Sequence, residues 1–257
     1  MEYIIYTIGS VLAVSLIAVI AAIPFLLKKQ IPHSVLIILM SLSVGTLLGG
    51  VFLHFLPELA EEGYTTSTAL SIIAGFLVFL LLEKFIHWHH SKKAEDDCSC
   101  GHSHAYHLAP LNILGDGVHN FLDGLVIAGS YAVSLPLGIA ATISVIFHEI
   151  PQEIADFGIL LYAGLTKTKA LLFNFLSAAA AIIGAITGIL FTEHIHGFSD
   201  MIIPFAIGNF LYIAASNLVP ELHKHCKITE TIMHIIAIGA GVGIMLLVAI
   251  LAPEHAH

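Results

Sequence analysis

The chain has 257 residues, of which 58% are hydrophobic and 11% are charged, and its formal net charge at pH 7 is −9. Soluble domains carry about 25% charged residues, so this composition excludes an ordinary soluble domain and indicates a membrane protein. The only basic residues are nine lysines, against eighteen acids, and this excludes a nucleic-acid-binding surface, which would be basic.

Most of the chain consists of apolar runs of about 20 residues, the length that crosses a bilayer as a helix. The start of the chain lacks the positive region of a cleavable signal peptide, so we expect the first run to be kept. The predicted fold is an all-α polytopic membrane protein in which residues 1–257 form a single transmembrane domain. Eight transmembrane helices are predicted, at about 3–27, 33–56, 67–86, 110–133, 137–163, 170–191, 201–221 and 232–251.

The lysines predict how the chain is oriented in the membrane. All nine follow the first, third, fifth or seventh predicted span, so they fall on one side. Because lysine and arginine concentrate in cytoplasmic loops, this side is expected to be cytoplasmic, and both termini extracytoplasmic.

Two similar motifs suggest an internal repeat. The sequence LPEL occupies 56–59 at the end of the second span, and VPEL occupies 219–222 at the end of the seventh. These spans cross in opposite directions, so the outer triplets of spans would form inverted repeats around the fourth and fifth. Such a 3+2+3 arrangement is common in transporters, with the substrate site near the midplane between the repeats.

The longest predicted loop, 87–109, is rich in histidine and cysteine and lies on the predicted cytoplasmic side. Imidazole and thiolate bind zinc and copper, so we expect this loop to bind metal outside the transport path, as a buffer or sensor. Its loose spacing is also compatible with a disordered polar linker. The candidate ligands are His87, His89, His90, Cys98, Cys100, His102, His104 and His107.

The fourth and fifth spans each carry one polar stripe, because residues three or four apart share a helix face. An Asp at the centre of a spanning helix costs ~2.5–3.5 kcal/mol on insertion scales. Neither span contains Lys or Arg, so the countercharge must come from protons or from a metal cation. Histidine, carboxylate and amide oxygen together are ligands of zinc and its first-row neighbours. The stripes consist of Asp116, His119, Asn120 and Asp123 in the fourth span and His148, Glu149, Gln152, Glu153 and Asp156 in the fifth.

Two further features of the spans carry expectations. Pro151 removes one backbone hydrogen bond within the fifth span, so the carbonyl of Phe147 should lack its usual partner. His54, alone in the outer half of the second span, is expected to be a hydrogen-bonded structural residue rather than a ligand.

These motifs resemble those of the ZIP (Zrt/Irt-like) divalent-metal transporters, over the whole chain. The specific matches are HNFLDG at 119–124 and HEIPQE at 148–153, similar to the subgroup whose fifth span reads HEIPHE, with FLPEL and GNFLYIAASNLVPEL in support. The resemblance implies a binuclear-type site made by His119, Asn120, Asp123, Glu149 and Gln152, with His148 and Glu153 adjacent. Asp116 and Asp156 are further candidate ligands. Gln152 departs from the subgroup, which has histidine there.

The resemblance also implies how the protein works. Spans one, four, five and six would slide as an elevator against a scaffold of spans two, three, seven and eight, and the scaffold would form a homodimer. The expected function is transport of a divalent metal into the cytoplasm, with zinc first and iron, manganese or cadmium as alternatives. The metal is the substrate, so no cofactor is expected. Membrane lipid is the other expected partner, and the compact length favours a prokaryotic plasma membrane.

Two other classes of function remain open from the residues alone. The same carboxylates could line a metal cation channel. An intramembrane zinc hydrolase is the less favoured alternative, since HEIPQ nearly matches the HExxH motif but lacks its second histidine. We therefore expect the protein not to be an enzyme.

Overall fold

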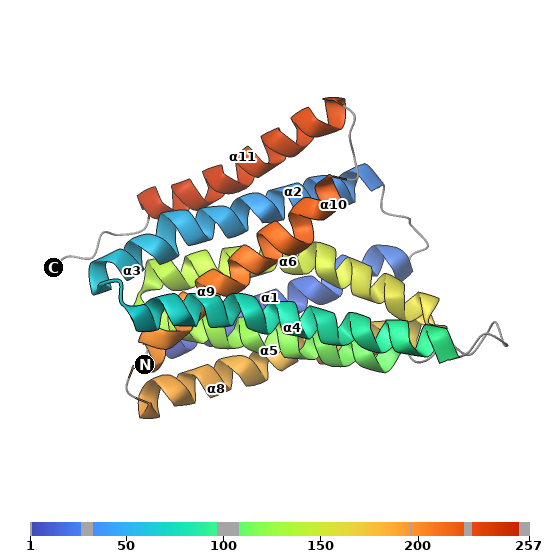
Figure 1. Cartoon of the computed structure of the whole chain (residues 1–257), viewed down its shortest axis with the longest axis horizontal. Helices are drawn as coiled ribbons and strands as arrows, with labels where there is room; N and C mark the ends of the chain where they lie inside the picture. The colour runs from blue at the N-terminus through green and yellow to red at the C-terminus, as the bar shows by residue number, and fades with distance from the viewer. Residues whose placement is uncertain (1, 27–32, 97–107, 196, 224–227, 252–257) are drawn as a thin grey trace.

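The computed structural model describes residues 2–26, 33–96, 108–195, 197–223 and 228–251, and every element within them is a helix (Figure 1). The all-helical prediction is confirmed for this part of the chain. The helices are α1 (Glu2–Leu26), α2 (His33–Gly50), α3 (Leu56–Glu62), α4 (Thr66–Asp96), α5 (Leu108–Val133), α6 (Leu135–Tyr162), α7 (Lys167–Ala178), α8 (Ala180–His194), α9 (Phe198–Tyr212), α10 (Val219–Leu222) and α11 (Ile228–Leu251). Two π-helical segments, η1 (Val51–Phe55) and η3 (Ile213–Leu218), connect α2 to α3 and α9 to α10.

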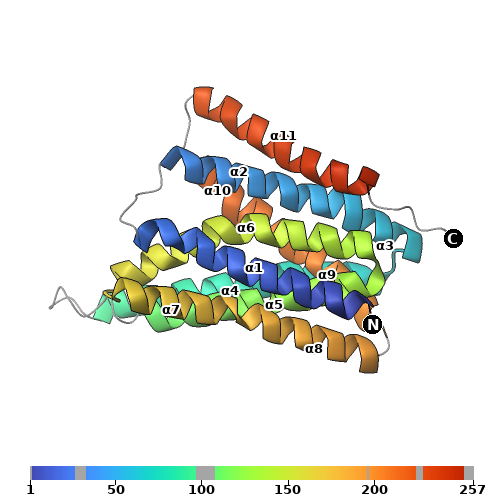
Figure 2. The same ribbon diagram turned by 180° about the vertical axis from the view of Figure 1, so that it is seen from behind.

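The long helices run roughly parallel to one axis of the molecule (Figures 1 and 2). The start of α1 and the end of α11 lie at one end, here called the terminal end. The end of α4 and the starts of α5 and α7 lie at the opposite end, here called the lysine end because Lys167 and Lys169 open α7 there. Helix α6 is central, since it packs against α1, α2 and α5.

Five helical segments are long and apolar enough to cross a membrane: Ser34–Glu61, Thr66–Lys84, Lys167–His194, Asp200–Leu218 and Ile228–Leu251. A shorter apolar segment, Glu2–Ile17, lies in α1. Helices α5 and α6 are outside this set, and they are the two that carry the polar stripes. The length and composition of the described helices thus support five of the eight predicted spans.

The predicted loop at 87–109 begins later than expected. Helix α4 continues to Asp96, so the backbone of His87, His89 and His90 is helical, and α5 begins at Leu108. Hydropathy marks where an apolar segment ends, whereas a helix continues through polar residues that favour it. The other candidate ligands of this loop, Cys98, Cys100, His102, His104 and His107, lie outside the described residues.

The predicted sixth span is two helices, because the chain breaks at Ala179. The Ser15 hydroxyl of α1 donates to the Ala178 carbonyl oxygen at 3.1 Å. The Ile182 amide donates instead to the Ala179 carbonyl oxygen at 3.1 Å. A hydrogen bond from another helix therefore replaces one bond of the helical ladder and separates α7 from α8.

Three helix pairs make their closest approach through reciprocal glycines. In each pair, a Cβ atom placed on the glycine of one helix would lie within 2.4 Å of a backbone carbonyl oxygen of the other. A larger residue must therefore separate the helices. The glycine pairs are Gly124 and Gly184 between α5 and α8, Gly45 and Gly241 between α2 and α11, and Gly75 and Gly208 between α4 and α9.

The substitution Gly184→Ala should destabilise the protein. Its new methyl group would lie 1.9 Å from the carbonyl oxygen of Phe121, so α5 and α8 must move apart. Overpacking of this kind costs ~1–3 kcal/mol. The measurement is the apparent melting temperature of purified protein in detergent. Gly239→Ala is the matched control, since a Cβ there meets nothing within 4 Å, and equal melting temperatures for the two variants would contradict this account of the packing.

Candidate metal centre

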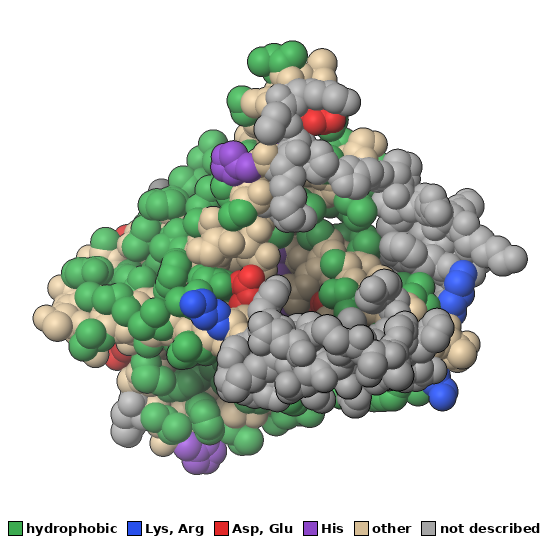
Figure 3. Space-filling view, turned by 45° about the vertical axis from the view of Figure 1, so that its right-hand side comes forward, with side chains coloured by type: hydrophobic (Ala, Val, Ile, Leu, Met, Phe, Trp, Pro, Cys, Tyr) green, Lys and Arg blue, Asp and Glu red, His purple; other side chains and the backbone are tan. Residues whose placement is uncertain are grey.

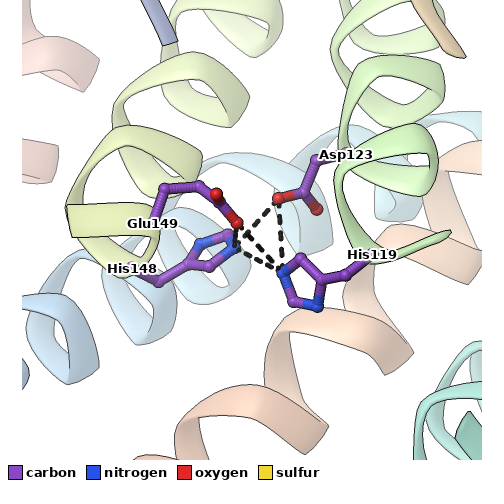
Figure 4. Close-up of side chains that lie close together, drawn as sticks. All are labelled: His119, Asp123, His148 and Glu149. Carbon is purple, nitrogen blue, oxygen red and sulfur yellow. Dashed lines mark hydrogen bonds and ion pairs between the residues drawn. The ribbon is translucent and has the colours of Figure 1, made fainter. Parts of the chain in front are cut away.

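A short helical hairpin brings the two polar stripes together. Helix α5 ends at Val133, and Ser134 caps α6 by accepting a hydrogen bond from the Leu137 amide at 3.3 Å. Pro136 lies in the first turn of α6, where a missing N–H group is tolerated. The hairpin makes α5 and α6 antiparallel neighbours, so the side chains of one stripe point toward those of the other (Figure 4).

Four side chains of the stripes converge on one point: His119 and Asp123 from α5, and His148 and Glu149 from α6 (Figure 4). The His119 Nε2 atom lies 3.2 Å from both His148 Nε2 and Glu149 Oε1, and 3.6 Å from Asp123 Oδ2. The His148 Nε2 atom lies 3.0 Å from Asp123 Oδ2 and 3.6 Å from Glu149 Oε1. We call these four residues the first cluster.

The spacing of these atoms matches the coordination shell of a small cation. A tetrahedral zinc ion with bonds of ~2.1 Å holds its ligand atoms ~3.4 Å apart. The five distances above run from 3.0 to 3.6 Å, and the same four atoms make all of them. Two imidazole nitrogens and two carboxylate oxygens could therefore hold such an ion with little movement.

The hydrogen bond from the His148 ring to the backbone determines which ring nitrogen carries the proton in the neutral form. Its Nδ1 atom lies 2.9 Å from the carbonyl oxygen of Ser144, which can only accept, so Nδ1 carries the proton. In the neutral ring, the Nε2 lone pair then points at the lone pairs of Asp123 Oδ2. Two acceptors at 3.0 Å repel unless a proton or a cation lies between them.

A second group of carboxylates, here called the second cluster, adjoins the first and shares Glu149 with it. Its members are Asp116, Glu149 and Glu153. The Asn120 amide donates to Asp116 Oδ1 at 2.9 Å, and the Gln152 amide lies 3.4 Å from the same oxygen. Because Glu149 has two carboxylate oxygens, it could bridge ions in the two clusters.

Both clusters are buried and rich in oxygens that lack a partner. The side chains of Asp123, His148 and Glu149 are at most 1% exposed, and that of His119 is 13% exposed. Within the described residues, Asp123 Oδ1, both Glu149 oxygens and Glu153 Oε1 accept no hydrogen bond. A buried ionised carboxylate needs a paired positive charge or a bound metal, so these atoms are suited to a cation.

Eight of the nine predicted stripe residues lie in or beside the two clusters. His119, Asp123, His148 and Glu149 form the first cluster, and Asp116 and Glu153 complete the second. Asn120 and Gln152 lie at the second cluster through their bonds to Asp116. Asp156 belongs to neither cluster and lies about one turn further along α6.

Four neighbours of the clusters were not predicted. The Asn174 amide of α7 donates to a carboxylate oxygen of Glu153, and Ser177 lies beside Asp116. Their three-residue spacing on an apolar helix is a sequence signal that could have identified them. The rings of Phe79 and Phe210 lie edge-on to His119 and His148, with centroids 5.1 and 6.1 Å apart, and no sequence pattern distinguishes these two from other core aromatics.

The expectations for the Phe147 carbonyl and for His54 are both confirmed. The Ser43 hydroxyl of α2 donates to the Phe147 carbonyl oxygen, the group that Pro151 leaves without its helical partner. The His54 Nε2 atom lies 2.9 Å from the Met245 carbonyl oxygen, so His54 is a structural contact between η1 and α11.

Comparison with known proteins identifies the family of this chain. The profile of the family described as ZIP Zinc transporter matches residues 1–110 and 89–249. The chain is 31% identical over 265 residues to the zinc transporter ZIP13 of Danio rerio, covering 82% of this chain and 75% of that protein. It is 32% identical over 225 residues to the zinc transporter YKE4 of Saccharomyces cerevisiae, covering 78% and 65%.

Other relatives are much longer than this chain. The similarity to the zinc transporter ZIP10 of Danio rerio is 35% over 150 residues, which is 56% of this chain and 18% of that protein. The chain therefore matches only a small part of that protein. With a family profile that matches most of its length, and with relatives that are transporters, the chain belongs to the ZIP zinc transporter family and is an integral membrane transporter rather than an enzyme.

Proposed function

We propose that the protein carries a divalent metal, zinc first, through the clusters between α5 and α6 into the cytoplasm. The proposal rests on the first cluster, where four ligand atoms, three of them on buried side chains, make five contacts of the length expected in a tetrahedral shell. No Lys or Arg of α5 or α6 is present to neutralise its carboxylates. A divalent cation would supply the missing charge.

The donor atoms favour zinc at the first cluster. Imidazole nitrogen with carboxylate oxygen is a borderline ligand set, suited to zinc and its neighbours. The second cluster offers only oxygen atoms, a harder set that suits manganese or ferrous iron as well. Two adjacent sites of different hardness, joined by Glu149, would let an ion move from tighter to weaker binding.

The distribution of polar groups supports a path toward the lysine end. Helices α5 and α6 bring Asp116, Glu153 and Asp156 progressively nearer to that end than the first cluster. Viewed obliquely from this side, the surface is hollowed, with acidic and histidine side chains in or beside the hollow (Figure 3). Because lysines mark the cytoplasmic side, the ion would leave into the cytoplasm.

The opposite side of the first cluster is apolar. After Asp123, helix α5 continues with Val126 and Ile127, and before His148, helix α6 presents Val145; all three are fully buried in the main core. Water and ions would meet this layer before reaching the cluster from the terminal end. The arrangement supports an inward-open state of a carrier with alternating access, and it speaks against a continuous pore in this state.

The boundary between two groups of helices supports an elevator motion. Helices α1, α5, α6, α7 and α8 would move against α2, α4, α9 and α11. The clusters lie on the first group, and Phe79 and Phe210 of the second group face their imidazoles. An apolar aromatic surface makes no directional bond to the ligands, so it would allow them to slide past it.

The helix packing supports the inverted repeat. Gly45 precedes Pro57 by 12 residues, and Gly208 precedes Pro220 by 12 residues. Each glycine contacts a partner helix, and each proline follows a π-helical segment. The pair α2 with α11 would correspond to the pair α9 with α4.

With eight spans, both termini would lie on the outer side of the membrane. The homodimer and the prokaryotic membrane stay predictions, and the relatives compared here are all eukaryotic.

Replacing ligands of the first cluster should abolish transport. His119→Ala and Asp123→Asn each remove one corner of the tetrahedron, and we expect zinc uptake to fall at least ~10-fold. The measurement is zinc uptake by purified protein in liposomes that contain a zinc-sensitive dye. His194→Ala, an exposed histidine at the end of α8, is the control and should transport normally. Normal uptake by both cluster variants would refute the proposed site.

Counterflow should separate a carrier from a channel. Liposomes loaded with unlabelled zinc should transiently accumulate labelled zinc above its equilibrium level, since a carrier exchanges bound ions across the membrane. A channel dissipates the gradient without such an overshoot. Zinc uptake without counterflow would favour the channel.

Gln152→His should tighten zinc binding and narrow the range of metals carried. Position 152 lies at the second cluster beside Asp116, so the substitution adds an imidazole nitrogen to an all-oxygen site. Slower release would accompany tighter binding and lower the turnover rate. Competition of labelled zinc with manganese and iron measures the selectivity of the wild type and the variant. Identical affinity and selectivity would mean that this side chain does not contact the ion.

A further inference from the structure

An apolar groove runs between α5, α7 and the start of α8, outside the two clusters. Helices α5 and α7 pack side by side (Figure 2). The groove has a volume of about 890 Å³ and is open along one side. Its walls are formed mainly by apolar side chains, including Ile113, Leu114, Phe121, Phe173 and Leu176.

The groove has one charged side chain at its edge. Lys169, in the first turn of α7, is the single basic or acidic residue among those that line it. Within the described part of the chain, its ammonium group forms no ion pair with a carboxylate. The N-terminus of α7, capped by Thr166, adds the partial positive charge of a helix start on the same side.

We propose that this groove binds an anionic phospholipid, with an acyl chain between α5 and α7 and the headgroup phosphate at Lys169. The volume lies within the ~300–1,000 Å³ range of ligand-binding pockets. Basic side chains at the cytoplasmic ends of pockets between transmembrane helices bind anionic headgroups. A free phosphate would use Lys169 alone and leave the apolar walls exposed, so the observations favour a lipid.

A bound lipid would lie directly behind the second cluster. Gly117 and Ser177 both line the groove, and Asp116 precedes Gly117 while Ser177 lies beside Asp116. Asn174, on α7, holds Glu153. The lipid would therefore fix the separation of α5 and α7 at the point where both contact the cluster. An effect of the lipid on metal uptake rests on the proposed function, whereas its binding does not.

Native mass spectrometry of the purified protein in a mild detergent tests the binding. Wild type should retain phosphatidylglycerol in preference to phosphatidylcholine, and Lys169→Gln should reduce this preference about fivefold, the typical contribution of one lysine near an anionic headgroup. Leu114→Trp, at a position 60% exposed, should fill the groove and lower retention of both lipids without disturbing the core. Lys167→Gln is the matched control and should behave as wild type, since Lys167 does not line the groove.

Three results would overturn the proposal. The first is an equal preference of wild type and Lys169→Gln for phosphatidylglycerol over phosphatidylcholine. The second is an equal loss of this preference in Lys169→Gln and Lys167→Gln, which would indicate diffuse surface charge. The third is displacement of the lipid by inorganic phosphate, which would indicate a simple anion site. If lipid retention follows the expected pattern while both His119→Ala and Asp123→Asn transport zinc normally, the proposed metal path fails and the lipid site stands.

Discussion

The structure depends on one electrostatic conflict at its centre. With the His148 ring neutral, its Nε2 lone pair faces Asp123 Oδ2 at 3.0 Å, and within the described residues the oxygens of Glu149 accept no hydrogen bond. In a low-dielectric interior this arrangement is unfavourable without a proton or a cation, because neither α5 nor α6 contains a Lys or Arg to relieve it. The surrounding helices must therefore be held firmly enough to keep the four ligands together. A bound ion would remove the repulsion among these ligands and so stabilise the folded bundle. The stability of the bundle would then depend on its substrate.

Reciprocal glycines supply much of this firmness. The pairs at α5–α8, α2–α11 and α4–α9 bring backbones close enough for dispersion forces to act along whole helices. Helix α6 has no such pair; its contacts with α2 use the hydroxyls of Ser43 and Ser144. Half of the metal ligands thus lie on a helix that no reciprocal glycine pair attaches to its neighbours.

The sequence predicted the stripes and most helix positions, because hydrophobic length and helical spacing are local properties. It also predicted the loss of a helical partner for the Phe147 carbonyl, which follows from proline chemistry alone. It did not predict the break at Ala179, because four consecutive alanines favour a helix and the cause is Ser15, far away in the chain. Nor did it predict Asn174 and the two phenylalanines at the imidazoles, since these contacts depend on how separate helices pack. Spacing identified the candidate ligands, whereas tertiary structure decides which of them meet.

The bond from Ser43 to Phe147 has a consequence for the energy barrier of the proposed movement. The same hydroxyl also lies 2.8 Å from the Leu39 carbonyl oxygen of its own helix, so it keeps an acceptor when α6 moves away. The Phe147 carbonyl, which Pro151 leaves without its helical partner, would need a water molecule in the other state of the proposed movement. The Ser43 hydroxyl would thus keep a hydrogen bond when the contact breaks, whereas the Phe147 carbonyl would need a water molecule. The rate of exchange between the two states would then depend on how readily a single water reaches the proline kink.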